Sequence, residues 1–298
     1  MPERQRVEII DPATATSDGE LGPFPWDLYG RRCLAQGDSW FSIGAIPPTL
    51  TTRILAELRF EASTVIVNCA RPGAVLHHMA ETSVAPMFLR LLSGKRALKW
   101  NAILLSGGGN DLIDAVGSPP SADPAQRLLR TAAERGPGPL TGADYLSPGG
   151  WQTFASHLGQ VFHGLVDRRD AGLNRATPIV WHNYARVMPR PAPAGPGFGP
   201  WLLPALDRFE VPAADRLLVA DELLGRLRRL IDALVAERWA QDPQARVFVA
   251  DSMSAGIDLA AAGSGGESGD WINEIHLTKA GYRKCAQAWQ QVLDPWLA

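Results

Sequence analysis

Five short runs of mainly apolar residues recur along this chain, and they constrain its fold more than any other feature. Their apolarity is continuous, as in TVIVNC and AILLS, which is typical of strands covered on both faces and hence of a parallel sheet. The segments between them carry a 3.6-residue period typical of helices. This alternation predicts an α/β chain folded as a doubly wound three-layer α/β/α sandwich. The predicted strands lie at about Arg32–Gln36, Thr64–Cys69, Ala102–Ser106, Pro178–His182 and Arg246–Asp251.

The order of the segments predicts one domain over residues 1–298. We interpret residues 1–30 as an N-terminal extension and the Gly- and Pro-rich stretches 112–149 and 189–204 as loop insertions, with one short helix near 124–135. Proline fixes φ and does not fit inside a central strand. Long loops in compact domains commonly serve as lids or binding loops, so we expect 189–204 to lie near a pocket mouth.

Bulk composition narrows the classes of function. Hydrophobic residues make up 46% and charged residues 20% of the chain, as in ordinary globular proteins. The formal charge of −2 gives no reason to expect nucleic acid as a partner. No apolar run approaches the roughly 20 residues of a membrane-spanning helix, so we expect no stable membrane insertion. The polar N-terminus lacks the apolar centre of a signal peptide, and the expected location is cytoplasmic.

The three cysteines and six histidines predict no metal or disulfide framework. The cysteines are scattered, which indicates reduced thiols. The histidines outside the motif described below show no metal-ligand spacing, and we expect surface or helix roles for them. They are His77, His78, His157, His163 and His182.

Four motifs stand where predicted strands end or where the last helix begins. They are GDSW at 37–40, NCARPG at 68–73, SGGGND at 106–111 and DWINEIHLTKAGY at 270–282. In open α/β sheets, ligands bind at the carboxyl ends of the strands, which is where the first three motifs are predicted to lie. The triple glycine would let a substrate approach the backbone closely. No phosphate-binding glycine pattern is present, so nucleotide binding is not expected.

Each motif alone also has an ordinary structural explanation. Asp38 or Ser39 could cap the next helix, Gly73 could ease a turn, and His276 could be a structural histidine. Asp111 is expected to brace its own turn. Asn183 and Tyr184 follow the fourth predicted strand, and either could line a pocket or have a purely structural role. The tryptophans of the motif and loop segments could form an apolar acyl pocket or belong to the ordinary core; they are Trp40, Trp201 and Trp271.

In this order, the four motifs resemble the conserved blocks of the SGNH (GDSL-type) hydrolases over about residues 32–282. The resemblance implies a flavodoxin-like fold with a five-stranded parallel sheet. It also implies Ser39 as nucleophile and His276 as general base. The oxyanion would be held by the backbone N–H groups of Ser39 and Gly73 and by the side chain of Asn110.

One position departs from the family pattern. The family usually carries Asp three residues before its histidine, and this chain has Asn273. In a serine protease, the corresponding Asp-to-Asn change costs roughly 10⁴ in turnover, largely through the wrong histidine tautomer. Asn273 can still accept a hydrogen bond from the imidazole, but it brings no charge. Asp270 or Glu274 could supply the missing carboxylate, or a backbone carbonyl could orient His276, and Asp270 is the preferred candidate.

The function expected from these residues is hydrolysis of a small-molecule carboxylic ester through an acyl-enzyme, with no cofactor. Acyl transfer to an alcohol is a second interpretation. A degenerate hydrolase that only binds an acyl or glycan ligand is a third, and Asn273 is the residue that suggests it.

Overall fold

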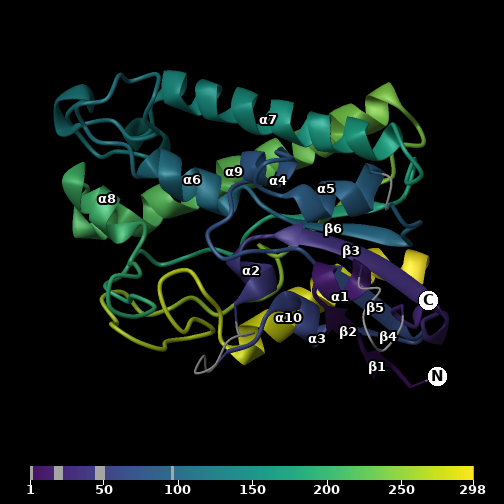
Figure 1. Cartoon of the computed structure of the whole chain (residues 1–298). Helices are drawn as coiled ribbons and strands as arrows, with labels where there is room; N and C mark the ends of the chain where they lie inside the picture. Colours follow the sequence, from purple (N-terminus) through teal and green to yellow (C-terminus); the bar gives the residue numbers. More distant parts are fainter. Residues whose placement is uncertain (1–2, 17–22, 44–50, 95–96, 298) are drawn as a thin grey trace.

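The five predicted strands form one parallel sheet in the computed structural model, which describes residues 3–16, 23–43, 51–94 and 97–297. Their order in the sheet is β5-β3-β6-β7-β8, or 2-1-3-4-5 when they are counted along the chain. This is the flavodoxin-like order. The three-layer α/β/α prediction is therefore confirmed (Figure 1). The strands are β3 (Arg31–Gly37), β5 (Thr64–Asn68), β6 (Ala102–Ser106), β7 (Ile179–His182) and β8 (Val247–Ala250).

Within the described residues the sheet has six strands, one more than the predicted five. The additional strand, β2 (Glu8–Ile10), pairs in parallel with β5 at the edge of the sheet. It belongs to the predicted N-terminal extension, of which residues 1–2 and 17–22 lie outside the described residues. A three-residue strand with one buried side chain, Ile10, carries too little pattern to be recognised. A separate antiparallel pair joins β1 (Gln5–Arg6) to β4 (Arg59–Phe60).

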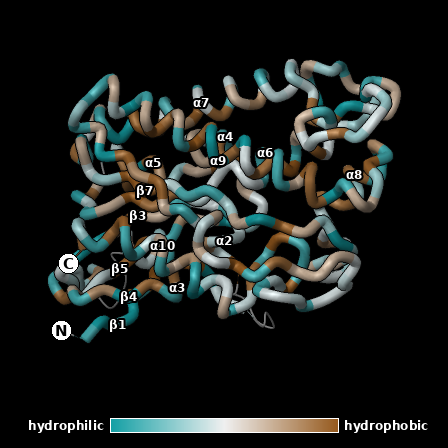
Figure 2. Tube along the Cα trace, turned by 180° about the vertical axis from the view of Figure 1, so that it is seen from behind, coloured by the Kyte–Doolittle hydropathy of each residue, from teal (hydrophilic) through white to brown (hydrophobic). Residues whose placement is uncertain are grey.

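Helices cover both faces of the sheet (Figure 1). On one face lie α4 (Leu76–Ala80), α5 (Pro86–Ser93), α6 (Gly109–Val116), α7 (Pro148–Asp170) and α9 (Arg216–Gln241), and on the other lie α3 (Ile54–Glu57) and α10 (Lys279–Leu297). Apolar residues concentrate between these layers (Figure 2). The stripe of α10 shows why that helix docks on the sheet, since its apolar residues at helical spacing are all fully buried: Tyr282, Ala286, Trp289 and Leu293.

The two predicted loop insertions are only partly irregular. The first overlaps the end of α6 and contains two short 3₁₀ helices, Ala132–Glu134 and Gly142–Tyr145, in place of the predicted helix near 124–135. The second runs into α8 (Leu203–Arg208). The remaining short elements are α1 (Pro12–Thr16), α2 (Ser39–Ser42) and the 3₁₀ helices Trp26–Leu28 and Ala213–Asp215. Among the described residues, no helix combines the length and apolarity that crossing a membrane requires.

Candidate active site

Ser39 and His276 meet at the carboxyl end of the sheet, although 237 positions separate them in the chain. The Ser39 Oγ lies 2.8 Å from His276 Nε2. Both side chains are almost completely buried. Burial lowers the pKa of His276 to about 4, so the imidazole is neutral at neutral pH. A neutral imidazole beside a hydroxyl is the pairing that a serine nucleophile requires.

The turn after β3 positions Ser39. Gly37 is required there, because a Cβ would lie 2.7 Å from the Ser106 Cβ on the neighbouring strand. Asp38 then caps α2 by accepting a hydrogen bond from the Trp40 backbone N–H at 2.9 Å. Ser39 is consequently the first residue of α2.

Asn273 orients the imidazole of His276. Its Oδ1 lies 3.1 Å from His276 Nδ1 and also accepts the backbone N–H groups of Ile275 (3.1 Å) and His276 (2.9 Å). These two backbone donors require the amide oxygen, and not the NH₂ group, to face the ring. Nδ1 therefore carries the proton and donates a hydrogen bond to Asn273 Oδ1. Nε2 is left unprotonated and can accept the proton of the Ser39 hydroxyl.

The expectation that a nearby carboxylate orients His276 is not met. Asp270 instead accepts Lys284 Nζ at 2.6 Å and the backbone N–H of Asp258 at 2.8 Å. Glu274 also faces away from the imidazole and binds the backbone of the proline-rich loop. Asn273 is thus the side chain that contacts Nδ1, and the predicted alternatives serve to hold loops.

The proline-rich segment 189–204 lies at the catalytic edge, as predicted. The Glu274 carboxylate accepts backbone N–H groups from Arg190 (3.2 Å), Trp201, Leu202 (2.8 Å) and Leu203 (2.9 Å). The Trp201 ring meets the His276 ring edge-on, with 5.4 Å between centroids. The segment therefore forms one wall around the histidine.

An apolar pocket opens beside Ser39. Besides Asp38, Ser39 and Trp40, it is lined by Gly109, Asn110 and Tyr184 and by the aliphatic side chains of Leu112, Ile113, Val187, Leu202, Leu224 and Ile275. Asn110 uses one side-chain N–H to bind the Ala74 carbonyl at 3.0 Å. An amide NH₂ has a second donor, which is the one that an oxyanion would use.

Of the three predicted oxyanion donors, Ser39 and Asn110 line this pocket and Gly73 does not. Gly73 is exposed, has a φ of +74°, and no atom outside its immediate chain neighbours lies within 4 Å of where its Cβ would be. This is a left-handed turn that favours glycine. Its role as an oxyanion donor stays a prediction.

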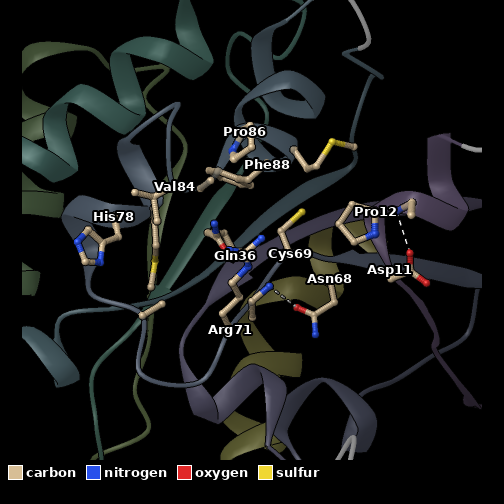
Figure 3. A pocket seen from close by; sticks show the side chains of 16 residues that line it. Asp11, Pro12, Gln36, Asn68, Cys69, Arg71, His78, Val84, Pro86 and Phe88 are labelled. Carbon is tan, nitrogen blue, oxygen red and sulfur yellow. Dashed lines mark hydrogen bonds between the residues drawn. The ribbon is translucent and has the colours of Figure 1, made fainter.

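A larger cavity of about 290 Å³ lies beside the ends of β3 and β5 (Figure 3). Its lining combines the polar residues Gln36, Asn68 and Arg71 with apolar residues such as Val84 and Phe88. Neither Ser39 nor His276 lines it. The cavity therefore offers additional binding room near the catalytic edge but no nucleophile of the predicted set.

The triple glycine makes room for the protein's own side chains rather than for a substrate. A Cβ at Gly109 would lie 2.6 Å from the Tyr184 ring, and one at Gly107 would lie 2.8 Å from Leu76. Tyr184 lines the pocket for this reason. Asn183 has a structural role, because its side chain binds Asp251 and the Met253 backbone, each at 2.9 Å.

A second set of Ser, His and Asp residues lies directly behind Ser39. Ser106 Oγ donates to Asp38 Oδ1 at 2.7 Å and lies 2.8 Å from His182 Nε2, and His182 Nδ1 lies 3.1 Å from Ser252 Oγ. Tyr184 O–H donates to the other Asp38 oxygen. These residues are buried, and the serine stands between the acid and the histidine. No solvent-exposed hydroxyl results, so the network supports the Ser39 turn.

Sequence reasoning missed this network. Burial raises the pKa of Asp38 to about 6 and lowers that of His182 to about 3. One signal was available: Asp38, Ser106 and His182 each stand at the carboxyl end of a predicted strand. The three cysteines are free thiols, as predicted, and burial raises the pKa of each to about 12.

Comparison with known proteins identifies the architecture. No family model and no curated protein matches the chain. Among solved structures, the lipase Lip_vut3 from a goat rumen metagenome is 13% identical, with a TM-score of 0.51 over 89% of this chain and 98% of the lipase. The chain has the fold of this lipase.

Other solved structures are similar over a comparable length. A candidate SGNH hydrolase from Slackia heliotrinireducens is 14% identical, with a TM-score of 0.43 over 88% of this chain and 98% of its own. An extracellular lipase from Streptomyces rimosus is 16% identical, with a TM-score of 0.45 over 89% of this chain and 99% of its own. At these identities the comparisons concern the fold and not the activity.

Proposed function

We propose that this chain is a serine esterase of the SGNH type that cleaves a carboxylic ester through an acyl-enzyme. The observation that carries the proposal is the 2.8 Å contact between Ser39 Oγ and the neutral imidazole of His276, whose tautomer Asn273 fixes. The fold shared with a lipase supports the same reaction class but does not by itself assign it.

Each of these residues has a role in the proposed reaction. Ser39 Oγ attacks the ester carbonyl carbon while His276 Nε2 takes its proton. The oxyanion accepts hydrogen bonds from Asn110 and from the backbone N–H groups of Ser39 and Gly73. The intermediate then collapses, and His276 returns the proton to the departing alcohol. Water repeats the sequence on the acyl-enzyme, which releases the acid and restores Ser39.

The apolar pocket favours an aliphatic acyl group. Its aliphatic lining would remove the carbon chain of an acyl group from water, which stabilises the complex by about 0.8 kcal/mol for each buried CH₂. The lining carries no Lys or Arg, so it offers no partner for an anionic acyl group. The alcohol would then face the open side of the site.

Ser39→Ala tests the proposal. Turnover of p-nitrophenyl esters should fall by about 10⁴-fold or more, because the nucleophile is lost. Labelling of the protein by a fluorophosphonate should disappear as well. Ser42→Ala is the matched control in the same short helix: its hydroxyl binds the Asp38 carbonyl at 2.8 Å and should not be needed for turnover.

Full activity in a folded Ser39→Ala variant would refute the assignment of the nucleophile. A wild-type protein that neither turns over esters nor reacts with the fluorophosphonate would refute the proposed esterase activity. It would favour the alternative of a degenerate hydrolase that only binds its ligand. Circular dichroism of both variants establishes that they are folded.

A further inference from the structure

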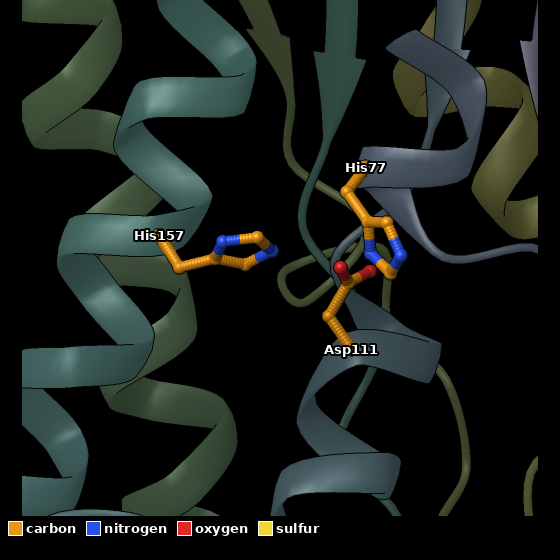
Figure 4. Close-up of side chains that lie close together, drawn as sticks. All are labelled: His77, Asp111 and His157. Carbon is orange, nitrogen blue, oxygen red and sulfur yellow. The ribbon is translucent and has the colours of Figure 1, made fainter. Parts of the chain in front are cut away.

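Three side chains from three different helices converge outside the active site (Figure 4). His77 comes from α4, Asp111 from α6 and His157 from α7. One imidazole nitrogen of each histidine and one carboxylate oxygen lie within 4.8 Å of one another. No local spacing marks this cluster, because 34 and 46 positions separate neighbouring members along the chain.

We propose that His77, Asp111 and His157 form a binding site for a transition-metal dication of the Zn²⁺ type. Two imidazoles and one carboxylate are a common donor set for zinc, which also accepts water as its fourth ligand. Ca²⁺ and Mg²⁺ prefer oxygen ligands throughout, so this set disfavours them.

The geometry requires only small side-chain rotations. Ligand atoms bound tetrahedrally to one zinc ion lie about 3.4 Å apart, because each bond is about 2.0–2.1 Å long. His157 is exposed and His77 is half-buried, so both rings have space to rotate toward a common centre. The exposed side of the cluster also gives water access to the remaining position.

Asp111 is the fixed member of the site. Its carboxylate is buried and accepts the backbone N–H of Leu76 at 3.1 and 2.9 Å and that of Gly108 at 3.2 Å. Within the described residues, all its hydrogen bonds thus come from neutral donors, and the carboxylate keeps lone pairs for a cation. Hydrogen-bonded carboxylates of this kind are typical metal ligands.

The site would join α4 and α6 to the long helix α7. Asn110 directly precedes Asp111, and its side chain binds Ala74 just before α4. A bound metal would therefore hold the two segments next to the predicted oxyanion donors. This inference does not rest on the proposed esterase function, since metal binding is measured without substrate.

Zinc binding to the full chain tests the proposal. After treatment with EDTA and its removal, isothermal titration with Zn²⁺ should show one equivalent bound. His157→Gln and His77→Gln should each raise the Kd at least about tenfold, because each removes a ligand. His163→Gln is the matched control on α7, where its ring pairs with Glu237 at 3.4 Å, and it should leave the Kd unchanged.

Two further measurements make the outcome decisive. Zn²⁺ should raise the melting temperature of wild type and of His163→Gln but not that of His157→Gln. Co²⁺ bound to the wild type should show the intense visible absorption of a tetrahedral site. The proposal is overturned if wild type binds less than one equivalent, or if His157→Gln and His77→Gln bind zinc as tightly as wild type.

Discussion

Asn273 orients His276 without bringing a charge to the site. Its oxygen is held toward the ring by two backbone N–H groups, those of Ile275 and His276. In a serine protease the Asp-to-Asn change is costly largely because the histidine adopts the wrong tautomer. The backbone donors fix the correct tautomer here, so the loss of turnover that comes from the wrong tautomer does not arise. Only the loss that comes from the missing negative charge beside the imidazolium remains.

Asn273→Asp tests this division between tautomer and charge. The added carboxylate should raise the pKa of His276 above its value of about 4. The acid limb of the kcat/KM profile should therefore move from near pH 4 toward the usual histidine range. At neutral pH we expect a gain of about tenfold, far below the roughly 10⁴ that also includes the tautomer effect.

Asp270→Asn is the matched control, because Asp270 binds Lys284 rather than His276. It should leave the acid limb of kcat/KM in place. A 10⁴-fold gain in Asn273→Asp would contradict the fixed tautomer. A large loss in Asp270→Asn with a shifted acid limb would instead make Asp270 the residue that acts on the imidazole.

Individual residues also show how far the sequence predicts the site. Ser39, Asn110 and His276 are recognisable because they belong to short motifs in a fixed order. The role of Asn273 is not, because it depends on which amide atom two backbone groups select. The Asp38 network is not recognisable from any motif, because its members come from separate strands and become partners only in the folded sheet.

At the scale of the elements, two loops support each other around the histidine. Glu274 binds four backbone N–H groups of the segment 189–204. Arg190 of that segment in turn donates to the Asn273 carbonyl at 2.8 Å. The orientation of His276 thus depends on a proline-rich loop whose place at this edge was predictable, whereas its attachment through Glu274 was not.

Glu274→Gln should loosen this loop. The amide of Gln has one acceptor oxygen, and its NH₂ group would face backbone N–H groups that are donors themselves. Hydrogen bonds to the buried carboxylate are therefore lost, which should lower the free energy of unfolding by about 1.5–3 kcal/mol. Urea unfolding should show that loss of stability, and ester turnover should fall as Trp201 leaves His276. Glu267→Gln, at an exposed position of the facing loop, should change neither. Equal stability of the two variants would contradict the role of Glu274.

The strands show the same limit of prediction. Five were predictable because continuous apolarity marks strands that are covered on both faces. The edge strand β2 was missed because only Ile10 of its three residues is buried. Short edge strands gain their structure from the partner strand, here β5, and carry little pattern of their own.

For the whole molecule, the buried titratable groups link stability to pH. The pKa values of His182 and His276 are lowered to about 3 and about 4, by burial in both cases, and that of Asp38 is raised to about 6. Below about pH 6.5 the unfolded chain protonates both histidines while the folded chain does not, so these groups lower stability as pH falls. Asp38 opposes this below about pH 6, because the folded state then binds the extra proton. Between about pH 6 and 4 the unfolded chain carries two of these protons, on the histidines, and the folded chain carries one, on Asp38. The net difference of one proton lowers the free energy of unfolding as pH falls.

His182→Gln isolates one of these contributions. The variant should be less stable than wild type at pH 7, because two buried serine hydroxyls lose their imidazole partner. Wild type alone must keep His182 unprotonated in the folded state, so its advantage over the variant should shrink as pH falls below about 6.5. The expected slope is about 1.4 kcal/mol for each pH unit, the value for one proton. Urea unfolding at pH 7, 6 and 5 measures this slope. A stability difference that stays constant over this range would show that folding does not lower the pKa of His182.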